Sequence, residues 1–298
     1  MIYALGLASD GTIAHFTAEA ARRSVPVTLI DLHDVLSGGD WRLAVPDDGQ
    51  SWLATAGQRY DLDADAAYYC RLIDLSSLEP DPGHALRWQS LVVALSAWLD
   101  HVPGTVVNRP GAGSDNGSKP LHEMNLHSLG FDVPESVTSS DRDRLRAFAA
   151  AGPTIVKALS GVRADSRLVG PADFDDFVPA QGPVHLQRYV RGSDIRAHVC
   201  GPDVYAEEIV SAAVDYRTAP AGQARYEPCD LPAELADRLV DRTRRLGLAF
   251  AGWDLKVDAD RRHWCLEVNP MPGYDWYDRR LDGAVSAALL GLLTGEAA

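Results

Sequence analysis

The chain has 298 residues, a formal net charge of −14 and 46% hydrophobic residues. This length is enough to bury a large core and suggests about two domains. The acidic excess argues against a nucleic-acid backbone or an anionic membrane as the main partner. The four cysteines lie far apart without a C-x-x-C pair, so neither a zinc ribbon nor a disulfide framework is indicated.

The ends and apolar runs of the sequence indicate no export or membrane insertion. The N-terminus lacks the basic stretch and the cleavage site of a signal peptide. The longest apolar run, residues 91–99, is too short to span a bilayer. We therefore expect a soluble, cytoplasmic protein with no membrane partner and no nucleic-acid partner.

The first hundred residues predict a small α/β domain. Its expected elements are the strands Ile2–Ala8 and Val25–Asp31 around the helix Thr12–Arg23, then the strand Ala66–Ile73 and a buried helix Gly83–His101. A strand–helix–strand opening is typical of α/β folds. The first turn, S-D-G-T, lacks the glycines of a dinucleotide-binding turn, so a Rossmann cofactor site is not expected.

A loop rich in glycine, proline and asparagine, Asn108–Pro120, is the best candidate domain boundary. A helix follows and ends at Gly130. Its His122 and His127 are five residues apart, rather than the four of a zinc metalloprotease helix, so we expect both on the helix surface. Beyond it the pattern predicts helices at 141–151, 233–247 and 282–293 and strands at 154–159, 184–190, 195–200 and 204–210. Hairpin strands with flanking helices indicate an α+β layer structure.

The stretch L-E-V-N-P-M-P-G at 266–273 ends a predicted strand with oxygen-bearing side chains. Strand alternation places Glu267 and Asn269 on one face. Residues 252–269 read as a hairpin, and a symmetric turn centred between Asp260 and Arg261 places Asp254 directly opposite Glu267. Three hard oxygen ligands suit Mg²⁺, which keeps water and nucleotide phosphates in its remaining positions. The alternative is a solvated hairpin face.

Basic residues stand out at three further positions. Lys157 lies in the apolar strand T-I-V-K-A-L and needs an anionic partner, either a phosphate or a neighbouring carboxylate. Arg196 shares a strand face with Asp194 and His198 and suits bidentate recognition of phosphate or carboxylate, although a polar face in water is the commoner case. Arg217 follows a strand in a D-Y-R loop, where most arginines are merely solvated.

From residue 108 to the C-terminus, the order of these features resembles the ATP-grasp superfamily. Within it, the chain is similar to RimK-type carboxylate–amine ligases and to the related ligases that modify ribosomal peptides (graspetide or microviridin type). The matching segments are Ser118-Lys119-Pro120, G-F-D-V-P-E-S at 130–136, Lys157, Gln187-Arg188-Tyr189-Val190, Asp194-Ile195-Arg196, Asp215-Tyr216-Arg217, Asp254, Glu267 and Asn269-Pro270-Met271-Pro272-Gly273.

The resemblance implies a fold and a set of roles. An N-terminal pre-ATP-grasp α/β domain at 1–107 precedes a two-lobed ATP-grasp fold, with a central lobe at 108–190 and a C-terminal lobe at 191–298 that carries the magnesium site. The implied ATP-binding residues are Lys119, Lys157, Gln187, Arg188, Tyr189, Val190 and Asp194. The implied Mg²⁺ ligands are Asp254, Glu267 and Asn269, and Arg196 and Arg217 would steady the transferring phosphoryl group and the acyl phosphate.

The implied reaction uses ATP and Mg²⁺ to convert a substrate carboxylate into an acyl phosphate. An amine, or less often a hydroxyl, then attacks it, with release of ADP and phosphate. The substrates would be a carboxylate and an amine on a peptide or an amino-acid-like molecule, and the sequence leaves a homo-oligomer open. Two alternatives are a small-molecule kinase on the same fold and a nucleotide-binding partner subunit without chemistry. Two departures from the family pattern are the single glycine in residues 159–169 and a length that is short for the peptide-modifying branch.

Overall fold

The structure is a computed structural model that describes residues 1–44, 49–112, 117–159 and 166–296. Its N-terminal part holds a parallel four-stranded sheet in the order β2-β1-β6-β7 and a small antiparallel sheet, β3-β4-β5. The elements are β1 (Ile2–Gly6), α1 (Gly11–Arg22), β2 (Val27–Asp31), α2 (Leu32–Gly38), β3 (Asp40–Arg42), β4 (Ser51–Ala54), β5 (Arg59–Leu62), β6 (Ala67–Cys70), the 3-10 helix η1 (Ser76–Leu78), α3 (Pro82–His101) and β7 (Val106–Val107). The parallel pairing of β1 with β2 around α1 is the predicted opening unit.

Helix α3 differs from the buried helix expected over this segment. Its inner face carries Trp88, Leu91, Leu95 and Trp98 into the N-terminal core. Two apolar side chains on its outer face, Leu86 and Val93, are 65% and 61% exposed. The run is apolar on both faces, and residue periodicity therefore could not distinguish the covered face from the exposed one.

A second, antiparallel sheet follows in the order β10-β9-β11-β8. Its elements, with the preceding helix, are α4 (Lys119–Ser128), β8 (Ser136–Ser139), α5 (Arg142–Ala150), β9 (Thr154–Lys157), β10 (Arg167–Val169), the 3-10 helices η3 (Pro171–Phe174) and η4 (Pro179–Gln181), and β11 (Val184–Arg188). Asp141 begins α5 by accepting hydrogen bonds from the N–H groups of Asp143 and Arg144. This cap explains why the helix begins where the sequence predicted.

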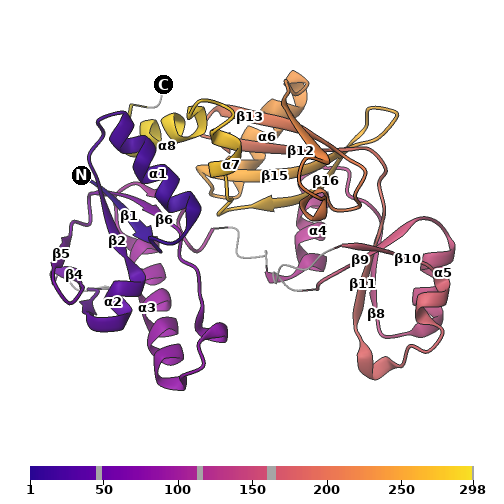
Figure 1. The fold of residues 1–298 in the computed structure, drawn as a ribbon, viewed down its shortest axis with the longest axis horizontal. Helices are drawn as coiled ribbons and strands as arrows, with labels where there is room; N and C mark the ends of the chain where they lie inside the picture. Colours follow the sequence, from indigo (N-terminus) through magenta and orange to yellow (C-terminus); the bar gives the residue numbers. More distant parts are fainter. Residues whose placement is uncertain (45–48, 113–116, 160–165, 297–298) are drawn as a thin grey trace.

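The third sheet is antiparallel, five-stranded and ordered β14-β13-β12-β15-β16. The remaining elements are β12 (Ser193–Cys200), β13 (Asp203–Ser211), η5 (Tyr216–Thr218), β14 (Ala224–Pro228), α6 (Ala233–Arg245), β15 (Phe250–Val257), β16 (His263–Asn269), α7 (Asp275–Asp278) and α8 (Ala284–Thr294). Figure 1 places this sheet between the N-terminal elements and the sheet of β8 to β11.

Two helices, α8 and α4, pack against a different predicted domain from the one that contains their own residues. Helix α8 lies beside α1 at the N-terminal domain, and its Leu289 and Leu290 share a core with Ile13 and Phe16 (Figure 1). Leu126 of α4 belongs to the core of the five-stranded sheet. The domain boundaries at 107/108 and 190/191 remain predictions, and these helices join the parts across them.

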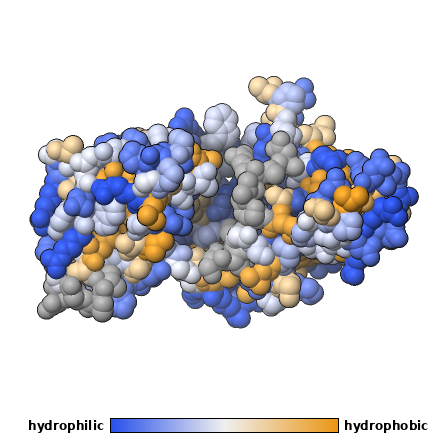
Figure 2. All heavy atoms as spheres, turned by 90° about the horizontal axis from the view of Figure 1, so that it is seen from below, coloured by the Kyte–Doolittle hydropathy of each residue, from blue (hydrophilic) through white to orange (hydrophobic). Residues whose placement is uncertain are grey.

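The predicted combination of α/β and α+β parts is confirmed by this element order. Figure 2 shows one face of the molecule, where hydrophobic residues form separate small patches among hydrophilic ones. Within the described part of the chain, no helix is both long and apolar enough to cross a bilayer.

Candidate active site

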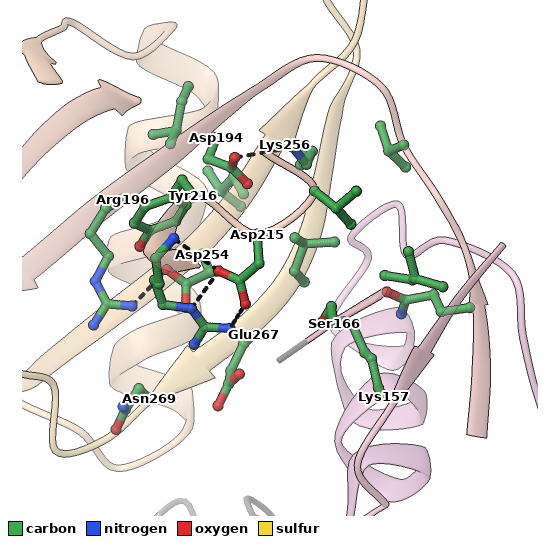
Figure 3. A pocket seen from close by; sticks show the side chains of 18 of the residues that line it. Lys157, Ser166, Asp194, Arg196, Asp215, Tyr216, Asp254, Lys256, Glu267 and Asn269 are labelled. Atoms are coloured by element: carbon green, nitrogen blue, oxygen red, sulfur yellow. Dashed lines mark hydrogen bonds and ion pairs between the residues drawn. The ribbon is translucent and has the colours of Figure 1, made fainter. Parts of the chain in front are cut away.

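A cavity of about 540 Å³ opens between the sheet of β8 to β11 and the five-stranded sheet. Every candidate site residue named from the sequence lines it: Lys119, Lys157, Gln187, Arg188, Tyr189, Val190, Asp194, Arg196, Arg217, Asp254, Glu267 and Asn269. Figure 3 shows Arg196, Asp254, Glu267 and Asn269 on the five-stranded side and Lys157 facing them from β9. The fold thus gathers segments that are up to 150 residues apart in sequence, since Lys119 and Asn269 share the cavity.

The β15–β16 hairpin brings Asp254 directly opposite Glu267, as the sequence predicted, but by a different register. The pairs nearest the turn, Val257 with His263 and Lys256 with Trp264, centre the turn on residue 260. That turn alone would place Asp254 opposite Leu266. A bulge between the Asp254 and Leu255 pairs inserts Leu266 and shifts the register by one residue. The expected symmetric turn is therefore wrong, and the bulge restores the carboxylate pair.

Each carboxylate of this pair contacts a different cation. Lys119 Nζ lies 2.8 Å from Glu267 Oε2, and an Arg196 terminal nitrogen lies 2.6 Å from Asp254 Oδ1. Burial raises the pKa of Glu267, but the charge and hydrogen bond of Lys119 outweigh it and the net pKa is lowered. Asn269 Oδ1 accepts a hydrogen bond of 2.8 Å from the Met271 N–H at the turn that ends β16.

These donors fit Mg²⁺, which takes one or two carboxylates and further oxygens at a nucleotide site. Asp254, Glu267 and Asn269 supply two carboxylates and an amide on one face of a hairpin. A set of three or more His, Cys, Asp or Glu side chains arranged to hold a metal does not occur in the described ranges. The predicted site has two such residues beside the Asn269 amide, and the remaining Mg²⁺ ligands would be phosphate and water.

Arg196 is fixed on several sides within the sheet. Its Nε donates to His198 Nε2 at 3.4 Å, and its guanidinium lies 6.0 Å from the ring centroid of Tyr277. Arg196 and His198 are only 8% and 1% exposed, so the expected alternative of a polar face in water is wrong here. Burial, followed by the charge of Arg196, holds the pKa of His198 well below its usual range, so this imidazole is neutral.

Lys157 ends β9 and is half-buried in the cavity wall. Burial lowers the pKa of its ammonium, while the charge of Glu123 opposes that effect. Among the described residues, no hydrogen bond or ion pair joins Lys157 to a neighbour, so its need for an anionic partner stays a prediction. The glycine-poor segment after it, residues 160–165, lies outside the described residues.

The end of β11 contributes a polar side chain and a length of backbone to the cavity. Gln187 is 1% exposed and donates through Nε2 to Glu123 at 2.7 Å. No partner for its Oε1 exists among the described residues. The side chain of Arg188 is held away by Glu135, 3.1 Å from its Nε, and by the ring of Phe148, 3.7 Å from its guanidinium carbon. Arg188 therefore offers the site mainly its backbone.

Asp194 is paired with a residue that sequence reasoning missed. Lys256 Nζ lies 3.0 Å from its Oδ2, and the same ammonium lies 5.7 Å from the ring centroid of Tyr189. Burial raises the pKa of Asp194 to about 6, although the charge of Lys256 opposes this shift. Lys256 lies two residues after Asp254 on β15, so strand alternation places both side chains on the cavity face. The sequence therefore contained a signal for Lys256.

Arg217 is held by a two-point contact with Asp215. Its Nε and a terminal nitrogen lie 2.7 Å and 2.5 Å from the two carboxylate oxygens. The Asp215 side chain is 5% exposed, whereas that of Arg217 is 42% exposed. Arg217 lines the cavity, as Figure 3 also shows for its neighbours Asp215 and Tyr216, so it is paired at the site and not merely solvated.

His122 is not on the helix surface, contrary to expectation. It is 2% exposed, and its Nε2 accepts a hydrogen bond of 3.0 Å from the Val268 N–H. This contact ties α4, and with it Lys119, to the strand that carries Glu267. His127 is exposed, as expected. A lone helix histidine gives no sequence signal that separates these two environments.

The fold and cavity can be compared with known proteins. No protein-family model matches the chain. The structure is similar to that of the ATP-grasp ligase PsnB complexed with a minimal precursor, with a TM-score of 0.78 and 25% identity over 98% of both chains. It also resembles the RiPP-associated ATP-grasp ligase of Chryseobacterium gregarium in complex with ADP and a leader and core peptide, with a TM-score of 0.80 and 15% identity over 100% of this chain and 97% of that one. The chain has the ATP-grasp fold.

The curated relatives align with a smaller part of this chain than the solved structures do. A stretch of 101 residues is 37% identical to a D-alanine–D-alanine ligase of Synechococcus sp. strain JA-3-3Ab, covering 30% of this chain and 31% of that one. The match thus spans about a third of the relative. The ATP-grasp fold expected from the motifs is confirmed, whereas placement in the RimK-type branch stays a prediction. The expectation that the chain is short for the peptide-modifying branch is wrong, because it covers 98% of PsnB.

Proposed function

We propose that this ATP-grasp protein is an ADP-forming ligase that activates a substrate carboxylate with ATP and Mg²⁺ and joins it to an amine. The observation that carries the proposal is the opposed Asp254–Glu267 pair, with Arg196 and Lys119 on its two carboxylates inside one cavity. This arrangement offers oxygen ligands for a metal ion and cations for phosphate within a single site.

Asp254, Glu267 and Asn269 would hold Mg²⁺, whose charge would neutralise phosphate oxygens during phosphoryl transfer. Lys119 and Lys157 would bind the phosphates. Phosphate oxygens would give Lys119 a new anionic partner when Glu267 holds the metal ion, so neither of these partly exposed charges would lose its counter-charge. Metal and nucleotide are therefore expected to bind together rather than in sequence.

The adenine would lie against Gln187, Arg188, Tyr189 and Val190 at the end of β11. Their backbone and the buried amide of Gln187 line the cavity there. Asp194, on the next strand, would accept hydrogen bonds from the ribose hydroxyls. That role needs the ionised carboxylate, and the Lys256 ammonium beside it favours this form.

The reaction would proceed by two displacements. A carboxylate oxygen forms a bond to the γ-phosphorus as the bond to the bridging oxygen of ADP breaks. The amine nitrogen then attacks the acyl carbon, the phosphate leaves, and the amine gives up a proton. Arg196 and Arg217 would stabilise the charge that gathers on the phosphoryl and acyl oxygens, because each lines the cavity with a guanidinium that a carboxylate holds in place.

A peptide is the favoured carboxylate substrate. Two of the similar structures are ligases solved with a precursor or with a leader and core peptide, and they align with this chain over nearly its full length. The partners would then be ATP, a peptide carboxylate and an amine. A homo-oligomer remains a proposal without a contact to support it.

The test is to incubate the protein with ATP, Mg²⁺ and a panel of Asp- and Glu-containing peptides and free amino acids, with hydroxylamine as the trapping amine. A ligase forms a hydroxamate and releases one ADP for each hydroxamate molecule. AMP in place of ADP would contradict the proposal, and a stable phosphorylated product would indicate a kinase. Nucleotide binding without turnover on the whole panel would indicate a partner subunit. Glu267→Ala is the matched inactive control.

A further inference from the structure

Four aromatic side chains line the cavity beside the predicted site residues, and neither the fold nor the proposed chemistry assigns them a role. We name this surface, consisting of Tyr216, Tyr226, Trp276 and Tyr277, the aromatic wall. All four line the cavity and come from η5, β14 and α7. Tyr226 packs edge-on against Tyr216 and against Tyr277, with ring centroids 6.3 Å and 6.4 Å apart.

The wall consists mainly of aromatic rings. The hydroxyl groups of Tyr216 and Tyr277 lie 3.1 Å apart and share one hydrogen bond. Trp276 is 60% exposed, which is unusual for the largest apolar side chain at the rim of a pocket. An exposed aromatic at a pocket rim fits a surface that is covered when a ligand binds.

The charge of the wall is already balanced. The guanidinium of Arg280 lies 4.6 Å, 5.2 Å and 5.7 Å from the ring centroids of Tyr226, Tyr277 and Trp276. Arg280 is itself paired with Glu207, which is 1% exposed, with Nε 2.9 Å from Oε1. The place for a cation over these rings is thus taken by a paired arginine. A second cation from a substrate would gain no counter-charge from Glu207, which Arg280 already holds, so the wall suits an uncharged group.

The position of the wall indicates which part of a substrate reaches it. Figure 3 shows Arg196 and Tyr216 on one side of Asp254 and Lys157 on the other. A substrate carboxylate under attack must lie between the arginines and the nucleotide phosphates. The rest of the substrate would then extend away from the nucleotide, towards Arg217 and the wall, which line the same cavity.

We propose that the aromatic wall is a substrate subsite that binds an apolar or aromatic side chain next to the acceptor carboxylate of a peptide. The inference rests on the proposed function for the direction of the substrate. Burial of one such side chain against the wall stabilises binding by about 1.5–3 kcal/mol, which corresponds to roughly ten- to a hundredfold in affinity.

Two matched peptides test the proposal, N-acetyl-Phe-Glu-Phe-amide and N-acetyl-Ser-Glu-Ser-amide. The protein carries 5-fluorotryptophan, and Trp276→Phe assigns the Trp276 resonance by ¹⁹F NMR in the presence of MgADP. We expect the Phe peptide to shift this resonance and to bind about tenfold more tightly than the Ser peptide. Trp276→Ala should remove that preference. Leu86→Ala, at an exposed site on α3, should leave it unchanged.

The outcomes separate this proposal from the proposed function. Equal affinity for the two peptides, or no shift of the Trp276 resonance with either, would overturn the wall as a subsite. Hydroxamate formation with ATP and hydroxylamine is measured on the same two peptides. If both are activated equally, only the subsite fails. If the Phe peptide binds at Trp276 but no hydroxamate forms, the subsite stands and the proposed activity of the chain on that peptide fails.

Discussion

Gly252 lies in β15 beside Arg196, and we predict that Gly252→Ala displaces that arginine. A methyl group at residue 252 would lie 2.6 Å from a terminal nitrogen of Arg196 and 2.8 Å from its guanidinium carbon. On its other side it would lie 2.7 Å from the Cβ of Pro272, whose ring cannot rotate away. Gly252 does not have a positive φ, so the backbone itself accepts alanine. The arginine must therefore move, and the chain that carries Pro272 must also give way.

The size of the displacement follows from these distances. Ordinary contact begins at 3.4 Å, so the Arg196 nitrogen must shift by about 0.8 Å from its place at 2.6 Å. That shift strains the 2.6 Å contact with Asp254. A misplacement of about 1 Å costs up to about a hundredfold in rate, and overpacking costs about 1–3 kcal/mol of stability. We expect kcat/KM to fall between tenfold and a hundredfold, while the nucleotide Kd stays within about twofold.

The assay is hydroxamate formation with the best peptide of the panel, beside calorimetric binding of MgADP and urea unfolding. Gly170→Ala is the control, because a methyl group there meets nothing within 4 Å. In an Arg196→Ala background, Gly252→Ala should destabilise the protein less than in the wild type. Wild-type turnover in Gly252→Ala would refute the reasoning, as would an equal loss in the Gly170 control.

Three further predictions concern the cavity residues. Glu267→Ala should abolish Mg²⁺-dependent turnover. It should change the free energy of unfolding by only about 1 kcal/mol, because the ion pair of Glu267 with Lys119 is partly exposed. Normal turnover in this variant would show that the hairpin has only a structural role. Arg217→Lys should fail to restore the kcat and kcat/KM lost in Arg217→Ala, since lysine lacks the planar fork that contacts Asp215; rescue by lysine would show that charge alone suffices. The pKa of Asp194 lies near 6, above its ordinary 3.8, so its carboxylate becomes protonated as the pH falls through about 6. The affinity for MgADP should therefore fall more steeply over this pH range in the wild type than in Asp194→Asn. Identical pH profiles in calorimetry would exclude a role for that charge. The same raised pKa means that Asp194 lowers the stability of the fold as the pH rises from about 4 to 6.

Local patterns in the sequence were sufficient for many of the helices and strands and for a set of predicted site residues that share one cavity. Strand alternation placed Glu267 and Asn269 on one face, and the cap at Asp141 marked the start of α5. These features depend on residues that are neighbours in the chain, so their physics is contained in a short window. The order of motifs from Lys119 to Gly273 carried the ATP-grasp resemblance in the same way.

Only the tertiary structure decided how those residues contact one another. The turn of the β15–β16 hairpin differs by one residue from the predicted register, and the bulge at Leu266 restores that register beyond it. A prediction that assumes a symmetric hairpin cannot reveal such an inserted residue. His122 is buried because it meets Val268, 146 residues away, while His127 on the same helix is not. Which face of α3 is covered, and which cation faces which carboxylate, depend likewise on distant segments. A sequence window fixes the faces of an element, whereas the partner of each face is chosen by packing across the whole chain.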